Sequence, residues 1–248
     1  MARPVAEDSP APPPAARAAA LFVIGSLVLS LSLMAAAMAL YPGGTWLDRA
    51  SPGHDFFRNF FCDLTADRAL NGQTNPGASF GKAGMILLSA GTLPFWFLVT
   101  RLFPERARLA LAVRGFGLAS ALAAIAVPLA PSQRYGSLHP LLIFIAAVPG
   151  LLAGGLATFG LLATKHGSRM PARLAGLTAG LAALDGALYA AHVASGVEIT
   201  SALLPALQKL AALALVAWMA GTAALAGLRE KGTSQLVDAV PRKNQSCT

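Results

Sequence analysis

The chain has 248 residues, of which 55% are hydrophobic and only 12% are charged, and its mean hydropathy is +0.60. A soluble domain normally carries roughly a quarter charged residues, so this composition excludes an ordinary soluble protein. The net charge of +8 lies in short basic clusters between long apolar runs, a pattern that orients membrane helices rather than binding nucleic acid.

Six apolar runs follow a leader, residues 1–17, whose Pro- and Ala-rich composition predicts disorder. Each run is about 20 residues or longer, enough to cross a bilayer, and only helices satisfy the backbone of such segments in lipid when strand alternation is absent. The first run is too long for a signal-peptide core, which favours an uncleaved helix. The expected spans are approximately 18–40, 80–100, 109–130, 139–163, 174–195 and 203–228.

The predicted fold class is therefore all-α: one polytopic six-helix transmembrane bundle over 18–228, followed by a disordered tail at 229–248. The connection at 41–79 is too long for a structureless loop in a compact domain, so we expect it to be ordered. A short helix is expected over 55–64, and turns are expected at Asn71-Gly72 and Asn75-Pro76.

The distribution of Lys and Arg predicts the orientation of the bundle. About twelve of these residues flank one side of the membrane and about four flank the other, and the richer side faces the cytoplasm. Both termini are then cytoplasmic and the 41–79 loop faces outward. Because Cys62 and Cys247 would lie on opposite sides of the membrane, both are expected to be unpaired.

Lys82 and Arg114 lie near the ends of their spans and are interpreted as interfacial anchors. Asp185 and Lys209 lie deeper, where charge is costly. Asp185 lies near the middle of the fifth span, where an ionised carboxylate costs about 2.5–3.5 kcal/mol. Lys209, in the sixth span, differs from it in depth by only about one helical turn. The structural interpretation is an Asp185–Lys209 ion pair. A proton or substrate path is the functional alternative, because intramembrane ionisable groups often mark one.

A second functional interpretation is a polar site at the outer face. It would combine polar residues of the outer loop with groups at the outer ends of the spans. Two His and a carboxylate can hold a catalytic zinc, so His139, Asp185 and His192 are weak zinc candidates, although no HExxH or CxxC spacing groups them. No other cofactor is expected. The candidate site residues are Asn59, Asp63, Asn71, Asn75, His139, Asp185, His192 and Lys209.

The outer loop carries a recognisable pattern: YPGGTWLD at 41–48, HDFFRNFFCDL at 54–64 and NGQTN at 71–75. It resembles a bacterial family of six-helix integral membrane proteins of unknown function, related to the Frag/DRAM/Sfk-type membrane proteins. Relatives often carry Ser followed by Asp-Leu-Gly where this chain has Cys62 and Thr65. The resemblance implies the six-helix fold, a bacterial cytoplasmic membrane and an important outer loop, and it implies no reaction.

Three functions follow as hypotheses. The first is a non-enzymatic protein that senses a ligand or supports a partner through a polar pocket at the outer face. The second is an intramembrane hydrolase, metal-dependent in one version, acting on a lipid-like substrate. The third is a transport-related accessory protein. Membrane lipids are the expected partners. Small residues spaced four apart, at Gly150/Gly154 and Gly176/Gly180, predict close helix contacts within one chain or in a homo-oligomer.

Overall fold

The computed structural model describes residues 13–164, 169–195 and 198–228. Six helices in this part of the chain are long and apolar enough to cross a membrane, which confirms the predicted all-α, multi-pass architecture. They are α1 (Pro14–Leu40), α2 (Ala78–Thr100), α3 (Ala107–Ala126) with its 3-10 extension η2 (Val127–Leu129), α5 (Leu138–Leu162), α6 (Arg169–Ser195) and α7 (Glu198–Ala223) with its π-helical end η3 (Ala224–Leu228).

The observed elements correct the sequence-based expectations in two places. Helix α1 already begins at Pro14, because proline fits the first helical turn, where its missing N–H is not needed. The predicted disordered leader is therefore wrong for residues 14–17, and residues 1–12 and the tail 229–248 lie outside the described residues. A one-turn helix, α4 (Ser132–Tyr135), was not predicted.

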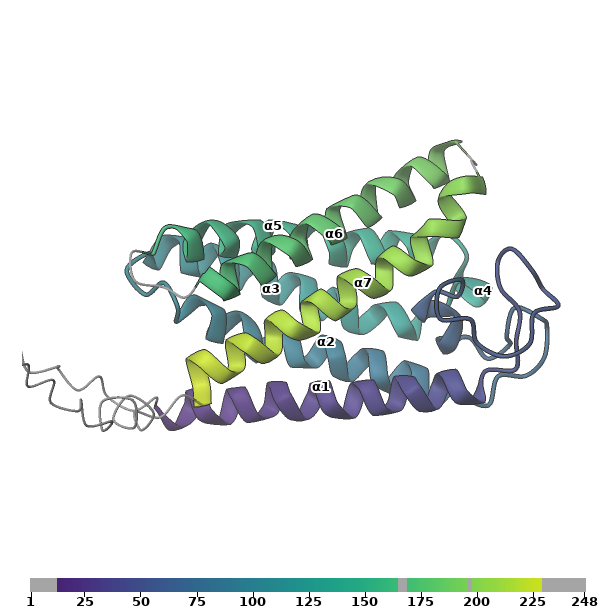
Figure 1. The fold of residues 1–248 in the computed structure, drawn as a ribbon, viewed down its shortest axis with the longest axis horizontal. Helices are drawn as coiled ribbons and strands as arrows, with labels where there is room; N and C mark the ends of the chain where they lie inside the picture. Colours follow the sequence, from purple (N-terminus) through teal and green to yellow (C-terminus); the bar gives the residue numbers. More distant parts are fainter. Residues whose placement is uncertain (1–12, 165–168, 196–197, 229–248) are drawn as a thin grey trace, which may run out of the picture.

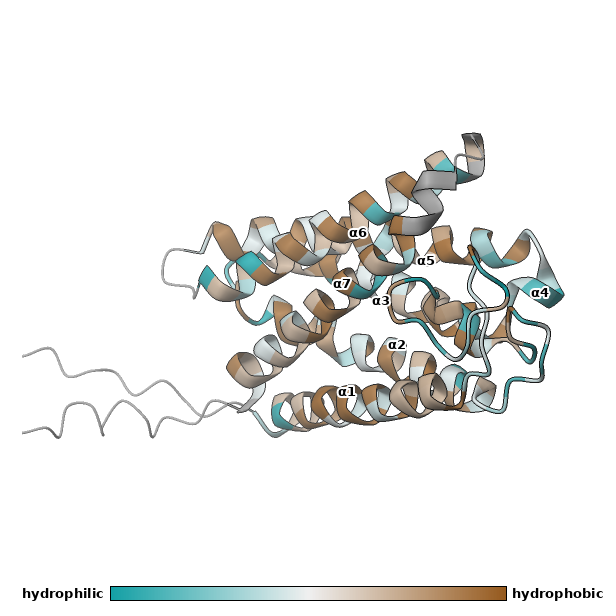
Figure 2. Cartoon of the chain, turned by 45° about the vertical axis from the view of Figure 1, so that its right-hand side comes forward, coloured by the Kyte–Doolittle hydropathy of each residue, from teal (hydrophilic) through white to brown (hydrophobic). Residues whose placement is uncertain are grey.

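The helices pack as neighbours along the chain, with the most extensive contacts joining α1 to α2, α3 to α5 and α6 to α7. Aromatic rings fill the centre: Trp218 of α7 lies edge-on to Phe95 of α2, with centroids 4.8 Å apart, and 5.8 Å from Trp96. Gly117 of α3 makes room for Trp96, because a Cβ there would lie 2.3 Å from its ring. Many large apolar residues of the helices are exposed, among them Leu111, Leu122 and Leu162, as expected for a surface in contact with lipid, and the helices are coloured mainly as hydrophobic in Figure 2.

Two of the four small residues expected at close helix contacts, Gly154 and Gly176, lie where α5 meets α6. A Cβ at Gly154 would lie 3.6 Å from Ala179 of α6, and a Cβ at Gly176 would lie 3.6 Å from Thr158 of α5. Gly150 instead faces Ser120 of α3. A Cβ at Gly180 would meet nothing within 4 Å among the described residues, so the predicted close contact is absent there.

Helices α1 and α7 form a V. They meet closely at the end of the bundle that holds the start of α1, where a Cβ on Gly227 would lie 2.3 Å from the Ala20 Cβ. From there α7 leans away from α1, toward the end that carries the loop between α1 and α2 (Figure 1). Residues 41–77 of this loop, which we call the lid, fold over that end, and Figure 2 colours several of their segments as hydrophilic.

Candidate functional site

The lid is an ordered structure built by its own turns. It contains one 3-10 helix, η1 (Phe61–Thr65), so the helix expected over 55–64 is shorter and begins later than predicted. The predicted turn at Asn71-Gly72 is present, with Gly72 at φ 85°. The turn at Asn75-Pro76 is also present: Asn75 accepts the Gly77 N–H at 3.0 Å and donates to the Ala66 carbonyl at 2.9 Å.

Glycine lets two segments of the lid, around residues 44 and 71, lie close together. Gly44 has a positive φ of 88°, and a Cβ there would lie 2.4 Å from the Asn71 backbone nitrogen. Tyr41, at the end of α1, accepts a hydrogen bond from the Leu70 N–H at 3.0 Å through its hydroxyl. Burial raises the pKa of that phenol to about 12, so Tyr41 stays protonated.

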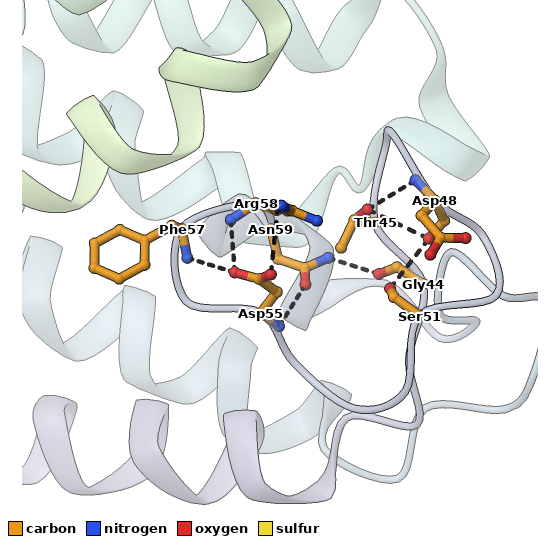
Figure 3. A network of polar contacts seen from close by, with 8 residues as sticks. All are labelled: Gly44, Thr45, Asp48, Ser51, Asp55, Phe57, Arg58 and Asn59. Atoms are coloured by element: carbon orange, nitrogen blue, oxygen red, sulfur yellow. Dashed lines mark hydrogen bonds and ion pairs between the residues drawn. The ribbon is translucent and has the colours of Figure 1, made fainter.

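Asn59 is the centre of the lid and is fully buried (Figure 3). Its Nδ2 donates to the Gly44 carbonyl at 2.8 Å and to Asp63 Oδ2 at 3.3 Å. Its Oδ1 accepts the Asp55 N–H at 2.9 Å. One side chain thus joins three segments of the lid, which explains why an amide is needed in the NFFCDL stretch.

Asp63 is also buried, and both of its carboxyl oxygens accept hydrogen bonds. Oδ2 accepts the Phe60 N–H at 2.8 Å, and Oδ1 accepts the Trp46 indole N–H at 3.2 Å. Burial raises the pKa of Asp63, and the hydrogen bonds from Phe60, Asn59 and Trp46 oppose that rise. The carboxyl group therefore holds the lid in its fold.

Lys209 connects the lid to the transmembrane bundle. This residue of α7 is only 1% exposed, and its ammonium donates to the Asn59 carbonyl and to the Pro205 carbonyl, the latter at 3.4 Å. The ammonium also lies 5.3 Å from the centre of the Phe56 ring and 5.1 Å from that of Phe61, within the range of cation–π attraction.

The predicted Asp185–Lys209 ion pair is not formed. Among the described residues, no Asp or Glu side chain forms an ion pair with Lys209, and Asp185 Oδ1 is buried without a hydrogen-bond partner. The physical reason is that the lid descends between α1 and α7 and offers Lys209 a carbonyl and two aromatic rings. The similar depth of Asp185 and Lys209 in adjacent spans was therefore not enough to predict which group each of them contacts.

The remaining predicted site residues lie in separate surroundings. His139 is buried at the start of α5, where its Nδ1 lies 2.8 Å from the Ala130 carbonyl. No hydrogen bond among the described residues joins Asn59 or Asp63 to His139 or Asp185. His192 lies in the last turn of α6. In the described ranges no three His, Cys, Asp or Glu side chains gather closely enough to hold a metal ion.

A cavity of about 260 Å³ lies beneath the lid, between α1, α2 and α7. Its wall is mainly apolar, with Met34, Met85 and Val216 among its residues. Phe56, Phe61 and Lys209 also belong to this wall, so the groups that fasten the lid are the groups that close the cavity.

The sequence-based prediction of the site did not include several of its residues. Gln208 accepts the Phe61 N–H at 3.0 Å, and its place beside Lys209 in an apolar span was the signal that could have found it. Trp46 gave no such signal. His54 has a buried Nε2 that finds no hydrogen-bond partner among the described residues. Its ring lies edge-on to Tyr41, and burial lowers its pKa to about 4.

Cys62 is a free thiol, as predicted, and burial raises its pKa to about 12. Cys247 lies outside the described residues.

Comparisons of the chain with protein-family models, with curated proteins and with solved structures gave no match. The fold therefore defines a class, a multi-pass helical membrane protein with a folded lid.

Proposed function

We propose that the protein is a non-enzymatic sensor in which the lid responds to a ligand held between α1, α2 and α7. The observation that carries the proposal is the double position of Lys209, which fastens the lid at Asn59 and also lines the cavity. A ligand that enters the cavity must contact the groups that hold the lid closed. Occupancy and lid closure are then coupled, because a ligand shifts the equilibrium toward the state it binds better.

The chemistry of the lid supports binding over catalysis. A general base must reach the proton that it removes, whereas both oxygens of Asp63 accept hydrogen bonds from within the lid. Both polar atoms of the Asn59 side-chain amide likewise form hydrogen bonds within the lid. The hydrolase alternative gains no support from this arrangement.

The proposed setting is the bacterial cytoplasmic membrane, with the lid outside and both termini in the cytoplasm, as the basic clusters and the resemblance of the outer loop imply. Reporter fusions test this orientation. A fusion after Lys231 is expected to report cytoplasm, and a fusion near Asn71 is expected to report the exterior. The reverse pattern would overturn the orientation.

Hydrogen–deuterium exchange tests the coupling. The protein is measured in nanodiscs made from the lipids of its own membrane and in nanodiscs made from one synthetic phosphatidylcholine. We expect the lid amides to exchange at least about tenfold more slowly in the native lipids, while those of α3 and α5 change little. Equal lid exchange in both would contradict the sensor.

A transport-related role is the second candidate, and the buried, unpartnered Oδ1 of Asp185 favours it. An intramembrane carboxyl group of this kind is typical of a proton or substrate path. Proton flux into liposomes that is lost in Asp185→Asn would support this role over the sensor.

A further inference from the structure

We infer that the cavity beneath the lid binds a single-chain amphiphile with a carboxylate head group, such as a long-chain fatty acid, with the carboxylate at Lys209. This inference rests on the proposed function and names the ligand class of the same site.

The mouth of the cavity shows where the ligand enters. Four of its wall residues are exposed: Leu31 at 48%, Ala35 and Leu213 at 51% on the transmembrane helices, and Phe56 at 39% on the lid. The three helical residues lie on α1 and α7, the two helices that diverge toward the lid (Figure 1). Because the surface of these helices is the apolar, membrane-spanning one, the cavity opens sideways toward lipid tails.

The shape of the cavity suits one slender chain. Its volume of about 260 Å³ is below the roughly 300–1,000 Å³ of typical small-molecule pockets. From Lys209 to Val216 the wall follows α7 for seven residues, about 10 Å at the helical rise. One hydrocarbon chain fills such a slot, with its remainder leaving through the mouth, whereas two chains do not fit.

The charge in the wall identifies the head group. Lys209 is the charged residue of this wall, and it carries no ion pair among the described side chains. Asp55 and Asp63 act on its charge only from beyond ion-pair distance. A buried cation that lacks a paired anion favours an anionic ligand, and its ammonium has three donors, of which two reach carbonyls.

The two hydroxyl groups of the wall already donate hydrogen bonds to backbone carbonyls. Ser30 donates its hydroxyl to the Gly84 carbonyl at 2.7 Å, and Ser89 donates to the Met85 carbonyl at 2.9 Å. Phe56 and Phe61 flank the ammonium. A head group therefore has one place to bind and must be compact, which favours a carboxylate over the glycerophosphate of a two-chain lipid.

Photo-crosslinking in phosphatidylcholine nanodiscs tests the inference. The probe is a fatty acid with a diazirine in the half of its chain nearest the carboxylate, the part expected to lie inside the cavity. The competitors are oleate and oleyl alcohol, which share a chain and differ in head group. We expect saturable crosslinks to peptides that contain Met34 or Met85. Oleate should compete at least about tenfold better than oleyl alcohol, because a charge-assisted hydrogen bond is lost with the alcohol.

Two variants test whether the hydrocarbon chain of the ligand lies in the cavity. Ala212→Phe fills the cavity from α7 and should reduce crosslinking at least about fivefold, whereas the matched control Ala217→Phe adds the same ring on an exposed face of α7 and should leave it unchanged. The charge test itself uses the wild-type protein, so it does not depend on whether Lys209 variants fold.

Three results would overturn the inference: equal competition by oleate and oleyl alcohol, crosslinks unaffected by Ala212→Phe, or stronger competition by phosphatidylglycerol than by oleate. The last result would mean a two-chain anionic lipid and would leave the sensor intact. The sensor itself fails in a different experiment, the lid exchange in native lipids, so the two failures are distinguishable.

Discussion

Replacing Asn59 with alanine removes the side chain that joins three segments of the lid. The change deletes hydrogen bonds to the Gly44 carbonyl at 2.8 Å, to Asp63 at 3.3 Å and from the Asp55 N–H at 2.9 Å. Asp63 keeps its bonds to Phe60 and Trp46, and the Asn59 backbone carbonyl still accepts from Lys209. The perturbation is therefore confined to the centre of the lid.

The magnitude follows from the groups left without partners. The Gly44 carbonyl is buried, and an orphaned buried group costs about 2 kcal/mol, whereas the half-buried Asp55 amide reaches water and costs about 1 kcal/mol. The free energy of lid opening should therefore fall by about 3 kcal/mol, which is about a hundredfold in the opening equilibrium.

Hydrogen–deuterium exchange with peptide resolution measures this opening directly, because exchange of protected amides follows the local opening equilibrium. We expect lid amides to exchange about a hundredfold faster in Asn59→Ala, with α3 and α5 unchanged. Asn71→Ala is the matched control: its side chain accepts only the Gln73 N–H, in an exposed turn, so its effect should stay below about tenfold. If the two variants behave alike, or if α3 opens by the same factor, the reasoning about Asn59 is refuted.

Three further outcomes follow from the same structure. Gly44→Ala should open the lid, because the new Cβ would lie 2.4 Å from the backbone nitrogen of Asn71. The control Gly53→Ala has open space around it and should cost only about 1 kcal/mol of left-handed backbone strain. Equal lid exchange in the two variants would contradict this. Gly117→Ala should destabilise the bundle by about 1–3 kcal/mol by driving a Cβ into Trp96, visible as a lower melting temperature in detergent; an unchanged melting temperature would mean that α3 can shift. Burial holds the pKa of His54 near 4 instead of 6.5, so between these pH values the open lid binds more protons than the closed lid. The stability of the closed lid should therefore fall as the pH drops from about 6.5 toward 4. Lid exchange, corrected for its intrinsic pH dependence, should show this loss of stability in the wild type and not in His54→Phe.

The sequence by itself determined the class of protein and the positions of its spans. Each crossing follows from local composition, since about 20 apolar residues in succession form a helix wherever they meet lipid, and the helices α1, α2 and α5 lie within a few residues of their predicted positions. The turns of the lid were predictable for the same reason, because Asn-Gly and Asn-Pro act on their own backbone.

Only the tertiary structure decided which polar groups meet. Lys209 was expected to pair with Asp185 from depth alone, yet it fastens the lid at Asn59, 150 residues earlier in the chain. That contact needs the room between α1 and α7, which lie close together at Gly227 and Ala20 and diverge toward the lid. A helix-crossing angle arises from packing over the whole interface, and no local pattern records it. The cavity beneath the lid exists for the same reason, because it occupies the space that the diverging helices leave.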